Sequence, residues 1–528
     1  MVAAAGEQTQ KHPTMAEVCT IQKTFRLLSL ISMKFLILFS FPQILEELKK
    51  MKDIAIPIAA INLVSYMKSM VSVSFLGRLG RLELAGGALA IGFTNITGYS
   101  VLSGLALGME PISSQASGSQ NFVLLSSTLL RAILMLLFAS IPIAILWPYL
   151  QPILLLLRQD PSVASVAADY CLFSLPDLIA NSLLQPIRIH LRSQGNPQPL
   201  MYSSLLASLL HLPLTFFLTK TLGVPGVSVA AFTTNFNTLL FLLAYLIITR
   251  TRTTDKSEPL YTPLLSTDTG SLKSGWGQLI KLALPSCLAV CLEWWWYELM
   301  TLASGYLNNP RVTLATSAIV IQTTSLMYTL PTTLSTAVSS RIGNELGAGQ
   351  PNRARAAAAG AMGLAAAGSC ISLAWATLGR EAWGKVFTDD FEVLKLTKTV
   401  LPIIGLCELA NCPQTTGCGV MRGSARPAVG AAINFFSFYV VGAPVSLLLA
   451  FVLDMGFVGL CLGLLTAQIM CALSIVLVTW RTDWNKEAMK ALNLVGGGEE
   501  ETNKAKIEGS KPIKRRGSCE FPKEVVGV

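Results

Sequence analysis

Charged residues are scarce in this chain. Only 13% of its 528 residues are Asp, Glu, Lys or Arg, whereas 52% are apolar. Water-soluble domains carry about a quarter charged residues, so the composition excludes an ordinary soluble protein. Long apolar runs with few charges are typical of a chain that crosses a lipid bilayer many times.

Histidines and nucleotide-binding signals are also scarce. The three histidines, His12, His190 and His211, are too few for the histidine clusters of membrane metalloenzymes. No GxxxxGK[ST] motif is present, so no nucleotide-driven pump is visible in this chain. The eleven cysteines form no CxxC pair, and most lie in apolar segments, where we interpret them as small buried side chains. We therefore expect no metal site, no cofactor and no enzymatic activity.

The net charge of +10 comes mainly from Lys and Arg in the tails and short loops. Positive charge in those places is a topology signal rather than a sign of nucleic-acid binding. If both termini are cytoplasmic, that side collects more Lys and Arg than the other, although the bias among the short loops alone is modest. We therefore expect a cytoplasmic N-terminus and a cytoplasmic C-terminus.

The sequence shows no evident cleavable signal peptide. Residues 25–41 are apolar, but they are few and are interrupted by Arg26 and Lys34. They could form an interfacial helix, an extra span or a gene-model artefact, and we favour a segment that does not span.

Twelve segments are long and apolar enough to span a bilayer, which takes about 20 residues each. They are residues 54–76, 85–113, 123–147, 161–192, 199–219, 225–249, 276–304, 313–342, 352–379, 390–421, 427–452 and 456–480. We expect an all-α integral membrane protein with twelve transmembrane helices in two six-helix lobes. The expected divisions are a cytoplasmic N-terminal segment 1–50, an N-lobe 51–249, a cytoplasmic linker 250–275, a C-lobe 276–481 and a disordered cytoplasmic tail 482–528.

The two halves of the chain resemble each other. IAIPIAAINLVSYMK (54–68) corresponds to LALPSCLAVCLEWWW (282–296), which places Pro57 opposite Pro285. LRSQGNPQP (191–199) corresponds in the same way to MRGSARPAV (421–429). Because each half has an even number of spans, both halves enter the membrane from the same side. A pseudo-twofold axis along the membrane normal should relate them, with substrate bound between the lobes.

Several longer motifs resemble those of the MATE (multidrug and toxic compound extrusion) transporters, in their plant detoxification-carrier branch. The matching stretches are LGRLGRLELAGGALA (76–90), GLALGMEPISSQASG (104–118), RIGNELGAG (341–349), CPQTTGCGVMRGSARP (412–427) and CLEWWWYE (291–298). This resemblance implies a two-lobed antiporter that exports organic solutes, often cationic, and is driven by inward proton flow.

The chain departs from that family at two places. Relatives carry Cys-Gly where Ser113 and Ser114 precede Gln115, so local packing is expected to shift. Bacterial and archaeal relatives often place an acid on the first span, at the position that aligns with Ser72. That substitution argues against a proton site of their kind in the first half.

Glu293 is the strongest candidate for coupling protons to cargo. It lies twelve residues after Lys281, which places it roughly 18 Å into a hydrocarbon core about 30 Å thick. An ionised carboxylate there costs at least ~2.5 kcal/mol unless it faces a cavity or a partner. Burial favours the protonated form, so proton and organic cation would compete for one group. The alternative is a fixed hydrogen bond that joins two helices.

The neighbouring aromatic residues are candidates for cation binding. Successive helical residues differ by about 100°, so Trp296 and Tyr297 share the face of Glu293. Aromatic rings attract cations by about 0.5–2 kcal/mol. The alternative is that the tryptophans only pack between helices.

The tenth span supplies the second group of candidates. Glu408 is a second coupling candidate or a structural acid, and Asn411, Gln414 and Thr415 are candidate ligands for substrate.

The remaining ionisable residues of interest are interpreted as structural, relay or gate groups. In the first half, Glu110 and Asp177 each adjoin a proline, and they could hold broken backbone together, serve at hinges or relay protons. Lys68 in the first span could pair with one of these acids or extend to the outer interface. Arg341 and Glu345 should pair at the cap of the eighth span. In the tail, Ser518 follows two arginines in a short kinase-like signal, for which chance is the simpler interpretation.

The expected partners are a small-molecule substrate, protons and the lipid bilayer, with no nucleic acid and a monomeric state. The expected location is the plasma membrane, the vacuole or another endomembrane. A lipid-linked flippase of the wider superfamily is the main alternative, and a channel or membrane enzyme is a more remote one. A flippase should line its cavity with many basic groups, and few Lys or Arg lie mid-span.

Overall fold

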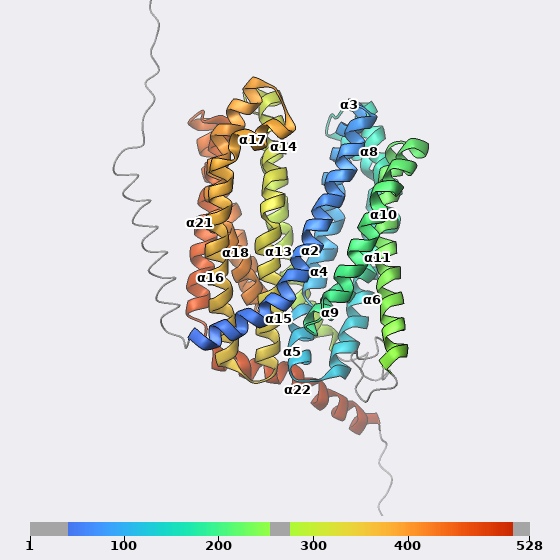
Figure 1. The fold of residues 1–528 in the computed structure, drawn as a ribbon, viewed down its shortest axis with the longest axis vertical. Helices are drawn as coiled ribbons and strands as arrows, with labels where there is room; N and C mark the ends of the chain where they lie inside the picture. Colours follow the sequence, from blue (N-terminus) through green and yellow to red (C-terminus); the bar gives the residue numbers. More distant parts are fainter. Residues whose placement is uncertain (1–40, 254–274, 510–528) are drawn as a thin grey trace, which may run out of the picture.

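The computed structural model describes residues 41–253 and 275–509, and within those residues the regular structure is entirely helical (Figure 1). The segment 25–40, most of the linker 250–275 and Ser518 lie outside the described residues. In the first half the helices are α2 (Phe41–Leu79), α3 (Arg81–Thr94), η1 (Asn95–Tyr99), α4 (Ser100–Leu107), α5 (Glu110–Gly118), α6 (Phe122–Leu146), η2 (Trp147–Tyr149), α7 (Leu150–Leu156), α8 (Pro161–Phe173), α9 (Leu175–Ser193), α10 (Gln198–Leu222) and α11 (Val224–Thr253).

The second half repeats this pattern and ends with an additional helix. Its helices are α13 (Trp276–Ser304), α14 (Pro310–Met327), α15 (Thr329–Gly347), α16 (Pro351–Leu378), α17 (Arg380–Phe387), α18 (Phe391–Gly423), α19 (Pro427–Asn434), η3 (Phe435–Gly442), α20 (Ala443–Leu447), η4 (Leu448–Val452), α21 (Gly456–Trp480) and α22 (Trp484–Gly509).

Nine helical segments in the described residues are long and apolar enough to cross a membrane, and α8 with α9 forms a tenth span bent by 44°. The two remaining expected spans are α14 with α15 and α18. These are long helices too, but they carry many Ser, Thr, Asn and Gln side chains, which lowers their hydropathy. All twelve predicted spans therefore coincide with helical segments.

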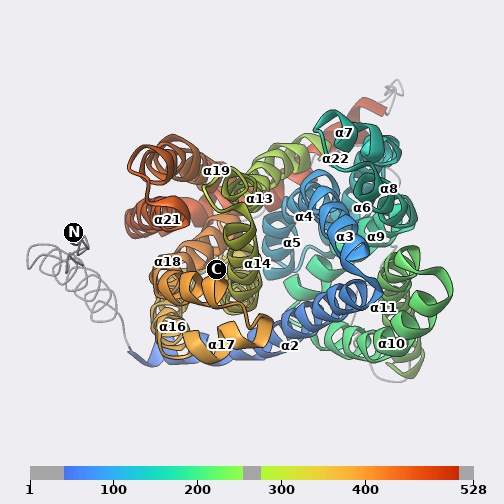
Figure 2. The same cartoon turned by 90° about the horizontal axis from the view of Figure 1, so that it is seen from above.

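The helices form two bundles, which we call the N-lobe (α3–α11) and the C-lobe (α13–α21) (Figure 2). Helix α2 extends along both. Its first part contributes Met51, Ile54 and Ile58 to an apolar cluster with α15 and α16, whereas Leu76 near its end packs in the N-lobe core. The sequence suggested an N-lobe that begins at residue 51, but the start of α2 contacts the C-lobe.

Small residues let the two lobes approach closely. A Cβ atom on Gly108 would lie 2.2 Å from the Cα atom of Ala283 in α13, and one on Gly104 would lie 2.6 Å from that of Cys287. Because real atoms do not approach so closely, only glycine fits at these positions. The GxxxG pair in the second span therefore holds α4 against α13, across the lobe boundary.

A second close contact joins α5 of the N-lobe to α15 of the C-lobe. A Cβ on Gly347 would lie 2.1 Å from the carbonyl oxygen of Gln115, and one on Gly343 would lie 1.9 Å from Ser114 Oγ. The Ser114 hydroxyl donates to the carbonyl oxygen of Glu110 at 2.7 Å, which satisfies it locally. The serine that departs from the family pattern thus fits above a glycine of the other lobe.

The expected disorder after residue 482 is wrong for α22, which the structure places as a helix across the lower face in Figure 1. Trp484, Ala488, Ala491 and Val495 are buried, and the first three belong to the cluster formed with α15 and α16. Their spacing of three and four residues gives one apolar helical face. This face, rather than the Gly- and Glu-rich composition that follows, decides the local structure.

Candidate functional site

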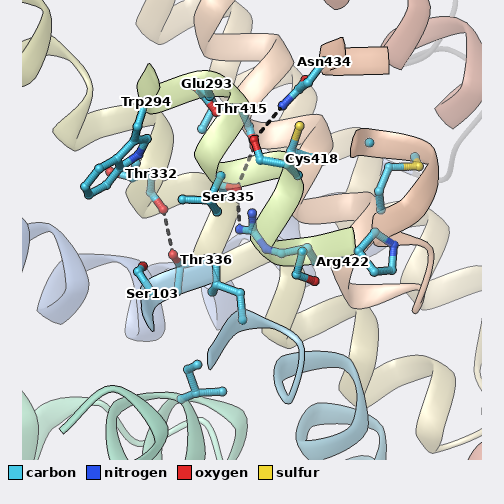
Figure 3. Close-up of a pocket in the computed structure, with 18 of the residues that line it drawn as sticks. Ser103, Glu293, Trp294, Thr332, Ser335, Thr336, Thr415, Cys418, Arg422 and Asn434 are labelled. Atoms are coloured by element: carbon cyan, nitrogen blue, oxygen red, sulfur yellow. Dashed lines mark hydrogen bonds between the residues drawn. The ribbon is translucent and has the colours of Figure 1, made fainter. Parts of the chain in front are cut away.

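A central cavity lies between the lobes, where α4 and α9 face α13, α15, α18 and α19 (Figure 3). The polar residues in its wall are Ser103, Gln185, Arg192, Ser286, Glu293, Tyr328, Thr332, Ser335, Thr336, Thr415, Arg422 and Asn434. The two most polar spans, α14 with α15 and α18, contribute many of them. The segments with the weakest membrane signal thus line the cavity, where polar groups do not face lipid.

Three hydroxyl groups of the cavity wall donate hydrogen bonds to nearby backbone. Thr332 Oγ1 donates to the carbonyl oxygen of Tyr328 at 2.7 Å, and Thr336 Oγ1 donates to that of Thr332 at 2.8 Å. Ser335 Oγ donates to the carbonyl oxygen of Thr415 at 2.6 Å, which joins α15 to α18. Such hydroxyls need no other hydrogen-bond acceptor, yet each keeps lone pairs that can accept a hydrogen bond from a solute.

Glu293 lies in the wall of this cavity and is only 9% exposed. Its Oε1 atom has no hydrogen-bond partner among the described residues, and no ion pair involving it occurs there. The Tyr328 hydroxyl lies beside the carboxylate. The described contacts therefore include no cation that fixes Glu293 in its ionised form, and the carboxylate remains available to a solute.

A second cavity adjoins the first on the side remote from α22. Its wall comprises Asn95, Ile96, Glu293, Trp294, Tyr297, Glu298, Ile321, Thr324, Ser325 and Tyr328. Three residues, Glu293, Trp294 and Tyr328, belong to the walls of both cavities. They form the boundary between the two spaces.

The aromatic residues distribute differently from the expectation. Tyr297 lines the second cavity, as predicted for a residue on the face of Glu293. Trp296 instead lies in the C-lobe core, 5% exposed and 5.6 Å from the ring of Phe438, and lines neither cavity. Trp294, which the spacing did not favour, lines both. With about 100° per residue, Tyr297 and Trp294 lie about 40° and 100° from Glu293 on one side, and Trp296 about 60° on the other.

The candidates of α18 form a hydrogen-bonded ladder. Asn411 Nδ2 donates to both carboxylate oxygens of Glu408 at 3.1 Å, and Thr415 Oγ1 donates to Asn411 Oδ1 at 3.2 Å. Glu408 and Asn411 are buried, whereas Thr415 reaches the central cavity. Gln414 is fully buried and lines neither cavity, so the structure does not bring it to the others. The ladder connects a buried acid to the cavity wall.

Two arginines that were not among the sequence-based candidates also line the central cavity. Arg422 Nε lies 3.2 Å from Glu110 Oε2, and its Nη2 donates to Ser335 Oγ at 2.9 Å. Arg192 Nη2 lies 3.8 Å from Glu110 Oε1. Since Arg192 and Glu110 belong to the N-lobe and Arg422 to the C-lobe, this ion-pair cluster closes the lobe boundary. The repeat offers a signal for it, because Arg192 and Arg422 stand 230 positions apart in corresponding motifs.

Known proteins share this architecture. The MatE family model matches the chain twice, over residues 57–217 and 285–448. The chain belongs to the MATE family of transporters. The two matches begin at Pro57 and Pro285, the same prolines that align the halves. Membership also identifies the protein as a transporter rather than an enzyme, and as a multi-pass membrane protein.

Similar MATE relatives come from plants. The chain is 59% identical to Protein DETOXIFICATION 55 of Arabidopsis thaliana over 87% of this chain and 92% of that one. It is 50% identical to Protein DETOXIFICATION 51 of the same plant, over 85% of this chain and 83% of that one. The eukaryotic MATE transporter AtDTX14 aligns with a TM-score of 0.80 at 31% identity, over 86% of this chain and 100% of that one. This likeness confirms the prediction of twelve helices in two lobes.

A buried polar network occupies the N-lobe of this MATE transporter. Asp177 accepts from the Tyr99 hydroxyl at 2.8 Å and from Asn235 Nδ2 at 2.7 Å, while Lys68 Nζ donates to Asn235 Oδ1 at 2.9 Å. Lys68 therefore connects with Asp177 through Asn235. The network lines neither cavity, and each member has a fixed partner, which favours a structural role.

The gate and cap candidates of the MATE fold also come together. Arg341 pairs with Glu345 within α15, as the spacing predicted, and Arg341 Nη2 lies 2.7 Å from Glu47 Oε2. Glu47 is a buried residue of α2. The pair thus extends to a three-residue cluster that ties the start of α2 to α15, away from the cavities.

Proposed function

We propose that this MATE transporter exports organic solutes by exchanging them for protons with alternating access. The solutes are xenobiotics, secondary metabolites or hormone-like compounds, often cationic. One observation carries the proposal: a buried carboxylate without a fixed cationic partner, Glu293, stands in the wall of a cavity between two lobes. The protonated form of Glu293 is neutral and holds a cation weakly, whereas the ionised form attracts it. Competition between proton and cation at one carboxylate couples the two fluxes.

The neighbouring groups support this exchange. Tyr297 and Trp294 present aromatic surface beside Glu293, and ring faces attract cations. The ladder of Glu408, Asn411 and Thr415 offers a route by which a proton held at the buried acid reaches the cavity.

In this proposal, the other candidates pack behind the cavity walls or join the two lobes. Trp296 and Gln414 support the walls from behind, because neither reaches a cavity. Glu110, Arg192 and Arg422 close the lobe boundary.

The orientation we propose places α22 and both termini on the cytoplasmic side, with the protein acting as a monomer in the plasma membrane, the vacuole or another endomembrane. The linker 250–275 and the residues after 481 lie on that same side, and the N-lobe and C-lobe divide at the linker. In this orientation the α5–α15 contact closes the cytoplasmic end. The second cavity lies toward the opposite surface.

Exchange in vesicles tests the proposal. Purified protein is reconstituted in vesicles loaded with a plant metabolite extract, a pH gradient is imposed, and untargeted mass spectrometry identifies the solutes that leave. We expect gradient-dependent efflux that Glu293→Gln abolishes and Glu381→Gln leaves unchanged, because Glu381 is an exposed acid paired with Lys398 outside both cavities. If Glu293→Gln still exchanges protons for solute at the native rate, the assignment fails.

The lipid-linked flippase remains the second candidate, and one observation favours it. Arg192 and Arg422 bring basic groups into the central cavity, where the sequence alone suggested few. Glu110, however, lies between these two arginines and offsets one of their charges. Scrambling of a labelled lipid-linked pyrophosphate by the reconstituted protein, without organic solute efflux, would favour the flippase.

A further inference from the structure

Helix α22 contacts both lobes at the end of the molecule where they meet. It packs against α15 and α16 of the C-lobe and against α5 of the N-lobe. Figure 1 shows it crossing the lower face from one bundle to the other. The close contact between α5 and α15 joins the lobes at this same end, so α22 touches both partners of that contact. Separation of α5 from α15 must therefore move α22 away from at least one lobe.

The first turns of α22 are attached to the C-lobe. Trp484, Ala488 and Ala491 are buried in the apolar cluster that includes α15 and α16. The buried Glu487 has its Oε1 atom 3.9 Å from Nη1 of Arg426, which lies between α18 and α19. Detaching this end would expose three apolar side chains and break a largely buried ion pair, and both changes cost free energy. The C-lobe end is the firm attachment.

The following turn of α22 reaches the N-lobe through fewer contacts. Leu494 is half-buried and packs against the apolar cluster that fills the N-lobe. Asn121, which precedes α6, donates from Nδ2 to the carbonyl oxygen of Val495 at 3.5 Å, the long limit for a hydrogen bond. Among the side chains that the structure describes, no ion pair joins α22 to the N-lobe. The N-lobe end is therefore the weaker attachment.

We propose that α22 is a latch on the closed end of the transporter. It stays anchored to the C-lobe, holds the N-lobe through Leu494, Val495 and Asn121, and lets go of the N-lobe when α5 and α15 separate. Because these N-lobe contacts exist in only one of the two states, weakening them shifts the balance toward the open state. The proposal goes beyond the proposed function and rests on its alternating access, since a latch needs two states to act on.

Three single variants of the full-length protein separate the latch from general effects on the fold. Leu494→Ala removes the apolar contact with the N-lobe. Asn121→Asp keeps the oxygen that accepts from the Leu124 amide at the start of α6, but it loses the donor to the Val495 carbonyl. Leu492→Ala is the matched control, because Leu492 is an exposed residue of α22 that belongs to neither apolar cluster.

Double electron–electron resonance follows both the lobes and α22 in these variants. Spin labels are introduced in pairs as noncanonical amino acids, so the native cysteines do not react. The labelled positions are Gln198 of the N-lobe, Gln350 of the C-lobe and Asn493 of α22, all of which are exposed. The Gln198–Gln350 distance measures opening, and the two distances from Asn493 show which lobe α22 follows.

The expected result is a larger population with a long Gln198–Gln350 distance in both Leu494→Ala and Asn121→Asp. For Leu494→Ala the ratio of open to closed forms should rise by up to about tenfold, as the loss of a half-buried leucine side chain predicts. In the opened population the distance from Asn493 to Gln198 should lengthen, whereas the distance from Asn493 to Gln350 should stay as it is in the closed form.

Two outcomes overturn the proposal. One is that Leu494→Ala and Asn121→Asp open the protein no more than Leu492→Ala does. The other is that opening lengthens the distance from α22 to the C-lobe instead of the distance to the N-lobe. If either latch variant does not fold, as its elution and melting temperature would show, the other variant decides the result.

Failure of the proposed function would show in a different measurement, as proton-driven efflux that survives Glu293→Gln. The three distances are recorded without solute and without a pH gradient. Each result therefore stands apart from the other.

Discussion

The glycine contact between α5 and α15 predicts how the α22 side opens. Replacing Gly347 by alanine would place a Cβ atom 2.1 Å from the carbonyl oxygen of Gln115. Carbon and oxygen atoms rarely approach closer than about 3.3 Å, so the two helices must separate by about 1 Å. Forcing extra atoms into a packed contact typically costs about 1–3 kcal/mol. Because this cost falls on the state in which the lobes touch, states with separated lobes gain population.

A cost of about 1.4 kcal/mol corresponds to a tenfold shift in the ratio of closed to open forms. Spin labels at Gln198 of the N-lobe and Gln350 of the C-lobe, both exposed, allow the distance across this end to be measured by double electron–electron resonance. We expect Gly347→Ala to increase the population at longer distances. Gly430→Ala is the matched control, because no atom lies within 4 Å of its added Cβ.

An unchanged distance distribution in a folded Gly347→Ala protein would refute the reasoning. It would mean that the helices relax without separating, or that the α5–α15 contact does not limit opening. A fall in melting temperature without any change in distance would likewise show that the strain acts on the whole fold.

Two further predictions concern charges. Glu110→Gln should destabilise the detergent-solubilised protein by about 3–5 kcal/mol, because it leaves buried arginine charge uncompensated. In thermal melts, the double variant Glu110→Gln with Arg422→Gln should lose less stability than the sum of the two single variants. Additive losses would contradict the pairing. The amide of Ser162 holds the pKa of Asp160 below its usual range. Because this pKa lies below the unfolded value of about 3.9, the ionised carboxylate stabilises the fold above that value, and the stabilisation is lost as the pH falls through the folded-state pKa. Asp160→Asn should therefore lower the melting temperature slightly at pH 7 and not at pH 2.

The spans could be predicted from sequence because burial in lipid imposes a strong apolar pattern. Helix α22 was missed although its pattern is present, since Trp484, Ala488, Ala491 and Val495 recur at helical spacing. The Gly-, Glu- and Lys-rich composition of the following residues outweighed that signal. Amphipathic helices at the bilayer surface are short of the apolar length that identifies a span, and their apolar faces need a specific partner.

The site could be predicted only in part. Glu293 and Tyr297, which lie in the cavity walls, could be singled out because an acid and an aromatic residue are conspicuous in an apolar helix. The spacing favoured Trp296 over Trp294 because the helical wheel does not say on which side of Glu293 the cavity lies. That side depends on α14 and α15, which pack from elsewhere in the chain. Arg192 and Arg422 fell at the ends of spans, where basic residues usually mark topology.

The repeat explains both the success and the limit of the prediction. Pro57 and Pro285 begin corresponding spans, and Arg192 and Arg422 stand at corresponding places, so the duplicated halves share backbone and boundary features. Not all of their acids correspond, although the N-cap residues Asp160 and Asp390 do. The position 228 residues before Glu293 is Ser65, so the deep carboxylate of the seventh span has no equivalent in the first.

The symmetry of the fold therefore does not extend to its chemistry. A single acid, Glu110, lies between the two symmetry-related arginines, and Glu293, whose Oε1 atom has no hydrogen-bond partner among the described residues, belongs to α13 of the C-lobe. In the proposed exchange, rocking of two similar lobes opens the cavities in turn, while one helix holds the groups that bind protons and cations. In the same proposal, duplication supplies the motion, and Glu293, which has no acidic counterpart in the other half, supplies the coupling.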